Sequence, residues 1–246
     1  SMGPDQMTPQ QQLDELNVRT KKFVAEQYRI LNDVILPELE QSDVHFVRRS
    51  RWTERQAEWV ADYFKREVLP VLSPIGLDPA HPFPRIINKS LNFIVSLKGE
   101  DAFGRESGIA VVQAPRSLPR LISMPEEIAG SPNSFVFLSS VIHAHVDKLF
   151  SGMVVRGCYQ FRVTRNAELF VDEEEIEDLL IALEDELYGR HYGDAVRLEV
   201  ADNCPMEVAQ FLLDHFHLKE ENLFQVNGPV NLNRLMMIPG EVERPD

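Results

Sequence analysis

Apolar residues recur every three or four positions along the start of this chain. One row is Leu13, Leu16, Thr20, Phe23, Gln27, Ile30 and Val34, and a second row of Val24, Leu31 and Ile35 widens it. Because an α-helix turns once in about 3.6 residues, this spacing predicts one long helix over residues 8–40 with an apolar stripe. Pro37 is expected to bend or end it. The stripe cannot cover itself, so we expect its partner helix to lie outside this chain.

A second helix precedes a proline-rich stretch. Thr53 followed by Gln56 is a capping-box pattern, and Ala57, Val60, Ala61, Phe64 and Val68 share a face, which predicts a helix to about Leu69. Each of the prolines that follow fixes its own φ angle and lacks a backbone N–H donor. Pro70–Pro84 is therefore predicted to be a stiff connector with Phe83 buried in it.

Beyond residue 84 the hydrophobic period becomes that of strands. Predicted strands are 90–97, 109–113, 119–124, 134–138, 153–165 (one strand or a pair) and 195–200, after an extended link at 45–48; predicted helices are 139–150, 173–188 and 205–216; apolar segments 223–226 and 235–238 close the set. This alternation predicts an α+β fold, in which a helical arm precedes a mixed, mainly antiparallel sheet with helices packed on one face.

Composition narrows the class of protein. The chain has 246 residues, of which 43% are hydrophobic, and no apolar run approaches the length of a membrane span. Cys158 and Cys204 are expected to be free thiols in a reducing cytoplasm. A net charge of −14 argues against binding of nucleic acid. The same charge requires that any polyanion be held by a local basic patch, or by another part of the protein.

Familiar nucleotide and metal motifs are absent or fail on geometry. Neither Gly-x4-Gly-Lys-Ser/Thr nor Gly-x-Gly-x-x-Gly occurs. In a helix, residues two apart point about 200° away from each other, so His143 and His145 cannot chelate one ion, nor can His215 and His217. A metal-dependent hydrolase would need stoichiometric metal in the purified protein. The acidic run that starts at Asp172 is interpreted as a helix N-terminus.

Arginine is the residue type here that is best suited to phosphate oxygens, because its planar fork donates two hydrogen bonds at once. Arg116 and Arg120 flank Ser-Leu-Pro. Arg162 and Arg165 are candidate phosphate contacts, although in a strand they would face opposite sides of the sheet. Salt bridging to a carboxylate such as Glu168 is the structural alternative.

Two long motifs, the first of them in two parts, point to a family. Residues 70–84 read Pro-x-Leu-x-Pro-Ile-x-Leu-Asp-Pro-Ala-His-Pro-Phe-Pro, residues 88–92 read Asn-Lys-Ser-Leu-Asn, and residues 161–168 read Phe-Arg-Val-Thr-Arg-Asn-Ala-Glu. They closely resemble the head region of the histidine-phosphorylating bacterial polyphosphate kinases. The resemblance implies that residues 1–44 are the end of the N-terminal helical domain, and that residues 45–246 are the head (middle) domain.

The resemblance also implies a function. The intact enzyme would reversibly transfer the γ-phosphate of ATP to polyphosphate through a phosphohistidine, with Mg²⁺ as cofactor. The catalytic, cofactor-binding and metal-binding residues would lie outside this chain, which would be inactive alone. His81 would then be a structural corner residue, and not the nucleophile. The opening Ser-Met-Gly-Pro is interpreted as a cloning remnant, with no signal peptide.

The implied partners are a second copy of the enzyme, ATP and polyphosphate. The head would pack on the N-terminal domain of the other subunit in a homodimer or higher oligomer, in the cytoplasm or peripherally at the inner membrane. A free-standing interaction module remains the alternative. A reading frame that stops near Asp246 would favour that module, whereas one that continues into a domain with the histidine would favour the enzyme.

Overall fold

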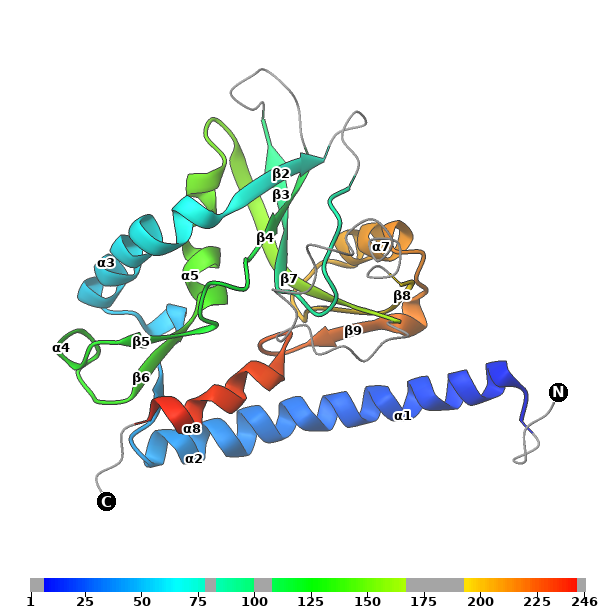
Figure 1. Cartoon of the computed structure of the whole chain (residues 1–246), viewed down its shortest axis with the longest axis horizontal. Helices are drawn as coiled ribbons and strands as arrows, with labels where there is room; N and C mark the ends of the chain where they lie inside the picture. Colours follow the sequence, from blue (N-terminus) through cyan, green and yellow to red (C-terminus); the bar gives the residue numbers. More distant parts are fainter. Residues whose placement is uncertain (1–6, 78–82, 100–107, 167–192, 243–246) are drawn as a thin grey trace, which may run out of the picture.

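The computed structural model describes residues 7–77, 83–99, 108–166 and 193–242, which form two β-sheets, packed helices and a long helical arm (Figure 1). The helices are α1 (Pro9–Ile30), α2 (Leu36–Gln41), α3 (Glu54–Tyr63), α4 (Glu126–Ala129), α5 (Leu138–His145), α7 (Met206–His215) and α8 (Ile238–Glu241). The strands are β1 (His45–Phe46), β2 (Ser73–Leu77), β3 (Asn92–Lys98), β4 (Ile109–Gln113), β5 (Leu121–Met124), β6 (Ser134–Phe137), β7 (Val154–Arg165), β8 (Ala195–Ala201) and β9 (Leu223–Val226). The α+β prediction is confirmed.

The predicted long helix is present as α1 and α2, joined by a π-helical turn over Leu31–Ile35. Thr8 and Gln11 form a capping box at its start. The π-helical turn lies just before Pro37, where the helical hydrogen-bond ladder must accommodate a residue without an N–H group. The proline therefore disturbs the helix, as predicted, but the helix continues to Gln41.

One face of α1 packs on the rest of the chain. Val24, Tyr28 and Leu31 are buried at 5–6% exposure in the main core, together with Phe224 of β9. The expectation that the helix's partner lies outside this chain is therefore wrong for this face. Val24 and Leu31 belong to the second row of the predicted stripe, whereas the apolar residues of its first row lie beside them and remain exposed. The N-terminal part of α1 extends past β9 (Figure 1).

The larger sheet has six strands in the order β2-β4-β3-β7-β8-β9. All neighbours are antiparallel except β8 and β9, which are parallel and are separated in sequence by α7. Strand β2 corrects the prediction of a connector over Pro70–Pro84. Its Pro74 is tolerated because β2 is an edge strand, where a missing N–H breaks no ladder with a further strand.

Both faces of this sheet are covered by helices, so the prediction that helices pack on one face is wrong. Phe93 and Val95 of β3 join the core formed with α3 and α5. Ile94, between them, joins the core formed with α7. Consecutive residues of a strand point to opposite faces, and β3 is apolar on both.

A second, three-stranded sheet was not predicted. Its order is β1-β6-β5, with β1 parallel to β6, and Val44, Leu121, Phe135 and Ile238 form its own small core. The apolar segment 235–238, for which no element type was predicted, is helical: a 3₁₀ turn over Leu232–Met237 leads into α8. Its apolar residues cover the small sheet, and do not pair with it.

Thr53 and Gln56 form the predicted capping box of α3, which continues as a π-helical turn to Val68. The other elements predicted within the described residues after residue 84 are present in the structure, and β7 is one strand of 12 residues. The predicted helix at 173–188, the acidic run from Asp172, His81 and Glu168 lie outside the described residues.

Cys158 and Cys204 are buried free thiols, as expected. Burial raises the pKa of each to about 12, so both remain protonated and unreactive at neutral pH. Within the described ranges, no helix combines the length and apolar character needed to cross a membrane.

Candidate anion-binding site

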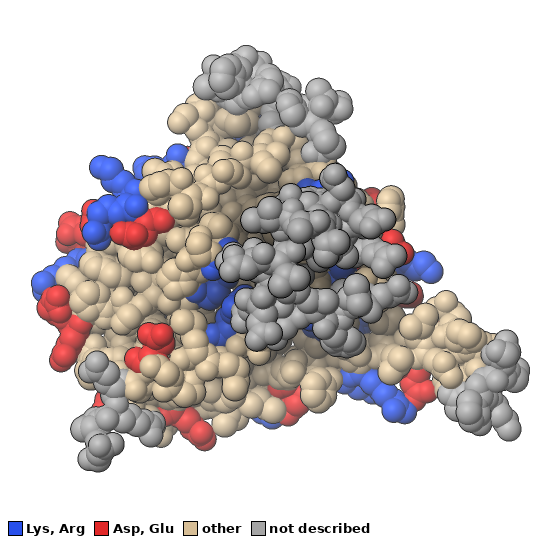
Figure 2. All heavy atoms as spheres, in the orientation of Figure 1, with Lys and Arg blue, Asp and Glu red and all other residues tan. Residues whose placement is uncertain are grey.

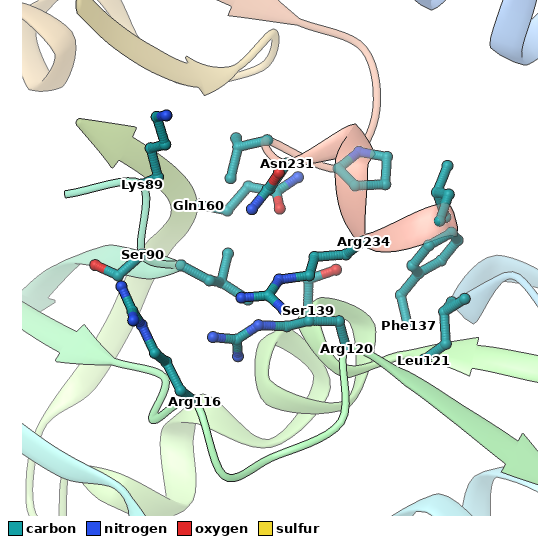
Figure 3. Close-up of a pocket in the computed structure, with 14 residues that line it drawn as sticks. Lys89, Ser90, Arg116, Arg120, Leu121, Phe137, Ser139, Gln160, Asn231 and Arg234 are labelled. Atoms are coloured by element: carbon teal, nitrogen blue, oxygen red, sulfur yellow. The ribbon is translucent and has the colours of Figure 1, made fainter. Parts of the chain in front are cut away.

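A basic pocket opens between the turn before β3, the loop before β5 and the segment after β9. Its charged groups come from Lys89, Arg116, Arg120 and Arg234, and its neutral polar groups from Ser90, Ser139, Gln160 and Asn231. No acidic side chain occurs among the described residues that line it. Arg120 and Arg234 run side by side toward Arg116 and Ser90 (Figure 3), and basic side chains gather near the middle of this face (Figure 2). In a chain with a net charge of −14, this is a local positive patch.

The Asn-Lys-Ser-Leu-Asn motif forms a fixed turn at one side of the pocket. Lys89 has a left-handed backbone, with φ of 58°, and its N–H donates to Val163 O at 2.8 Å. The Asn92 amide, which is fully buried, donates to Ser90 O at 3.0 Å and to Ser90 Oγ at 3.1 Å. Asn88 Oδ1 accepts the backbone N–H of Arg165. Short polar side chains thus hold the backbone that carries Lys89 and Ser90 at the pocket.

Arg120 is the most constrained cation of the pocket. Its Nη2 donates to Ala114 O at 3.3 Å, while its buried Nη1 has no partner among the described residues. Burial, together with the charges of Arg234 and Arg116, lowers the pKa of Arg120 to about 10. The three guanidinium groups therefore repel one another at short range, and an anion between them would relieve that repulsion.

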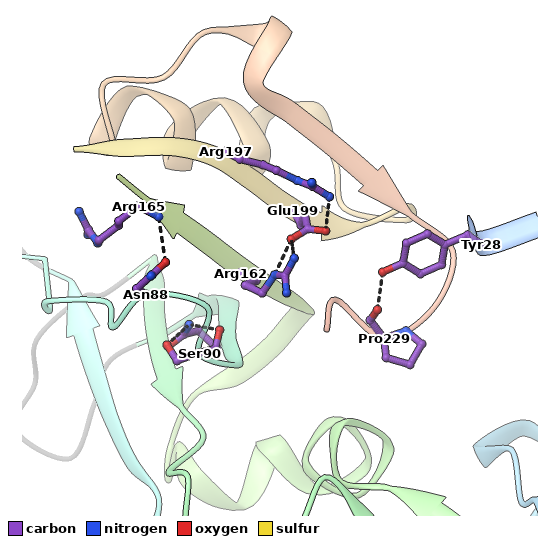
Figure 4. A network of polar contacts seen from close by, with 9 residues as sticks. Tyr28, Asn88, Ser90, Arg162, Arg165, Arg197, Glu199 and Pro229 are labelled. Atoms are coloured by element: carbon purple, nitrogen blue, oxygen red, sulfur yellow. Dashed lines mark hydrogen bonds and ion pairs between the residues drawn. The ribbon is translucent and has the colours of Figure 1, made fainter. Parts of the chain in front are cut away.

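The far wall of the pocket is held by the helical arm (Figure 4). Tyr28 of α1 donates to Pro229 O at 2.5 Å, and Asn32 donates to Asn227 O at 2.9 Å. Gly228 has φ of 152°, and a Cβ there would lie 3.1 Å from the Tyr28 ring, so only glycine fits. Because this loop leads directly to Asn231 and Arg234, α1 determines where those two side chains lie.

Glu199 links strands β7 and β8 next to the arm. It lies directly opposite Arg162 in the strand register and accepts hydrogen bonds from it. Arg197, two residues earlier on β8, donates to the other oxygen at 2.6 Å and lies 4.2 Å from the centre of the Phe224 ring. The partner of Arg162 is thus a carboxylate across the sheet, because cross-strand neighbours are closer than the end of the same strand.

Arg165 lies on the other face of β7, as predicted. Its Nε donates to Ile86 O and one of its terminal nitrogens donates to Gly193 O, each at 3.1 Å. Arg162 and Arg165 do not line the basic pocket among the residues described. Their predicted contact with phosphate stays a prediction, and Arg116 and Arg120, noted for their side-chain chemistry, are the arginines that the fold brings together.

A second hollow adjoins the basic pocket. It is lined by Arg49, Ser140, His143 and Asp202, among others, and has a cavity volume of ≈ 240 Å³. Arg49 donates to Nδ1 of His143 at 2.6 Å. Burial and the charge of Arg49 lower the pKa of His143, which keeps its ring neutral and able to accept this bond.

The paired histidines do not form metal sites within the described part of the chain. His143 bonds to Arg49, whereas His145 packs on the ring of Phe64 at 5.2 Å. His215 stacks on Phe83 with 3.7 Å between ring centres, so Phe83 is a half-buried contact of α7. No group of three or more His, Cys, Asp or Glu side chains among the described residues is placed to hold a metal ion.

Sequence reasoning missed two of the pocket's cations. Lys89 lies inside a motif that was noted only for its resemblance to a family. The left-handed backbone at Lys89 places its side chain at the pocket. Arg234 carried no signal, because it lies next to a segment that was noted only for its apolar residues. A basic residue inside a run of Asn and Ser was the one usable clue to Lys89.

Taken together, the described residues form a two-sheet α+β domain with a helical arm and a basic pocket, whose arginines are of the residue type that binds phosphate or carboxylate oxygens. The family profile described as "Polyphosphate kinase middle domain" matches residues 55–238, and that of "Polyphosphate kinase N-terminal domain" matches residues 1–47. The chain therefore belongs to the polyphosphate kinase family.

Individual relatives agree with this assignment. The chain is 56% identical over 244 residues to a polyphosphate kinase of Pseudomonas syringae pv. tomato, covering 99% of this chain and 33% of that protein. It is 54% identical over 238 residues to one of Neisseria meningitidis serogroup B, covering 97% of this chain and 35% of that protein. The chain thus spans about a third of the length of these curated relatives.

The fold also matches a solved structure. The crystal structure of polyphosphate kinase from Porphyromonas gingivalis superposes with a TM-score of 0.72 at 22% identity, over 93% of this chain and 32% of that one. At this identity the match supports the fold alone.

Proposed function

We propose that this chain is the N-terminal and head portion of a polyphosphate kinase that reversibly transfers the γ-phosphate of ATP to polyphosphate through a phosphohistidine. Family membership and identities of 54–56% with named polyphosphate kinases support this proposal. The end of the N-terminal helical domain is placed at residues 1–44 and the head at residues 45–246. ATP, Mg²⁺ and a cytoplasmic location belong to the same proposal for the intact enzyme.

Mg²⁺ is not assigned to residues of this portion. Oxygen ligands, chiefly carboxylates, are what Mg²⁺ prefers. The described residues include no group of acidic or histidine side chains placed to hold a metal ion, so they do not fit it.

The role proposed for this portion is assembly of the enzyme into a homodimer or higher oligomer. The observation that carries it is the exposed stripe of α1: Leu13 is 54% exposed, Leu16 57% and Phe23 67%. Leu13, Leu16 and Phe23 recur on one side of a helix whose adjacent face is already packed on the body. A contiguous apolar surface of this kind favours a protein partner. We assign that partner as a second copy of the enzyme.

The proposal that this portion has no kinase activity alone can be tested directly. The chain incubated with Mg²⁺ and ATP labelled at the γ-phosphate should yield neither labelled protein nor polymer, because the phosphorylated histidine is assigned outside it. Acid-quenched and alkali-quenched samples on a gel would separate phosphohistidine from phosphoserine. Acid-labile label that survives alkali and is retained by the chain would contradict the proposal.

The assembly role predicts a change in mass on substitution within the stripe. Leu16→Gln combined with Phe23→Gln should shift the chain toward the monomer in sedimentation velocity, because both side chains leave water only in the assembly. Val18→Gln is the matched control, since Val18 is 55% exposed on the opposite side of α1. A wild-type chain that remains monomeric at every concentration, or a Val18 variant that dissociates equally, would refute the stripe as the contact.

A further inference from the structure

The basic pocket and the second hollow adjoin each other. Ser139 and Gln160 line both of them. Ser139 lies at the start of α5, and Gln160 lies on β7 with its amide fixed to Gly228 O at 2.9 Å. A ligand that extends from the pocket past these two side chains would reach Arg49 and His143, which line the second hollow.

Charge along this path is predominantly positive. Lys89, Arg116, Arg120 and Arg234 lie at one end and Arg49 at the other, with Asp202 as the one acidic residue among the described lining. Between them lie the hydroxyl and amide groups of Ser139, Ser140 and Gln160, which can donate hydrogen bonds to oxygens. The ligand class that fits is an anion with repeated charges and acceptor oxygens along its length.

Size selects among such anions. The basic pocket has a cavity volume of ≈ 40 Å³, far below the about 300–1,000 Å³ of sites for nucleotide-sized ligands. It admits one phosphoryl group, not an adenosine. Single-stranded nucleic acid needs aromatic faces for its bases. Phe93 of the path is 1% exposed, and one face of the Phe137 ring is stacked on Phe46, so the described lining offers no row of open aromatic faces on which successive bases could stack.

We infer that this path is a binding groove for polyphosphate on the head domain, with one terminal or internal phosphoryl group held by Arg116, Arg120 and Arg234 and the chain continuing past Ser139 to Arg49. The identity of the polyanion rests on the proposed function. The groove itself rests on the residues that line it. Its consequence is that the head would retain the polymer at a place built only from residues of this chain.

The test measures binding of three probes to the folded chain by titration calorimetry at one ionic strength: inorganic phosphate, tripolyphosphate and long-chain polyphosphate. Affinity should rise with chain length. Arg120→Gln should weaken all three by about tenfold or more, because it removes a charge-assisted contact. Arg49→Gln should weaken only long-chain polyphosphate. Arg116→Gln, at an exposed position, repeats the first test without changing a buried group.

Arg66→Gln is the matched control, because it makes the same change in net charge at an exposed position in the π-helical turn that follows α3, where Arg66 pairs with Asp62. It should leave all affinities unchanged. The inference is overturned if no probe binds, if the Arg66 variant loses as much affinity as the Arg120 variant, or if single-stranded DNA competes as well as polyphosphate. If Arg49→Gln weakens tripolyphosphate binding as much as it weakens long-chain polyphosphate binding, the proposed path from the pocket to Arg49 is overturned. Labelling by ATP would instead refute the proposed function and leave these results standing.

Discussion

Glu199→Gln should destabilise the fold by about 3–5 kcal/mol. Glu199 is 2% exposed and accepts hydrogen bonds from both Arg162 and Arg197, whose side chains are 16% and 23% exposed. Glutamine keeps the shape but removes the charge, which leaves two largely buried guanidinium groups facing a neutral amide. For a chain of this size the melting temperature should fall by roughly 6–20 °C. Thermal and urea unfolding followed by circular dichroism would measure both quantities.

Glu15→Gln provides the control for this substitution. It removes the same charge from the pair with Arg19 on α1, where the side chains are 44% and 74% exposed. An exposed pair of this kind contributes about 1 kcal/mol at most. If the two variants unfold at the same urea concentration, the Glu199 network does not stabilise the fold through its charge.

The Glu199 network also explains why the arm and the basic pocket form one unit. Arg197 covers the ring of Phe224, and Phe224 packs in the same core as Tyr28 of α1. Burial and the nearby charge of Glu199 raise the pKa of Tyr28, which therefore stays protonated and donates to Pro229 O. The arm and the loop that precedes Arg234 are thus connected by direct contacts within this chain.

Local signals in the sequence predicted most single elements correctly. The capping box at Thr53 and the three-to-four spacing of α1 depend only on neighbouring residues, and the structure contains both helices, with a further capping box at Thr8 that was not predicted. What failed was the prediction of which elements meet. Helices on both faces of the sheet follow from β3 being apolar on both sides, which alternation alone does not reveal.

The candidate site was only half predictable for the same reason. Arg116 and Arg120 lie four residues apart and could be grouped by sequence, whereas Arg234 joins them from more than one hundred residues away. The partner of Arg162 depends on the register between β7 and β8, which sequence does not set because a long segment separates the strands. Local chemistry thus identified the residue type, while the fold determined which residues lie together.

Phe161→Ala should cost about 3–5 kcal/mol, because the ring is fully buried between β7 and α7 and its removal leaves a cavity. The ring centre of Phe216 lies 6.4 Å away and cannot fill that space without moving α7. The same substitution at Phe23, 67% exposed on the stripe of α1, should change the free energy of unfolding of the monomer by less than about 0.5 kcal/mol. Urea unfolding at a dilution where the chain is monomeric would compare the two variants. A large loss of monomer stability in Phe23→Ala would mean that the stripe belongs to this chain's own core, and a small one in Phe161→Ala would mean that α7 does not pack on the sheet as described.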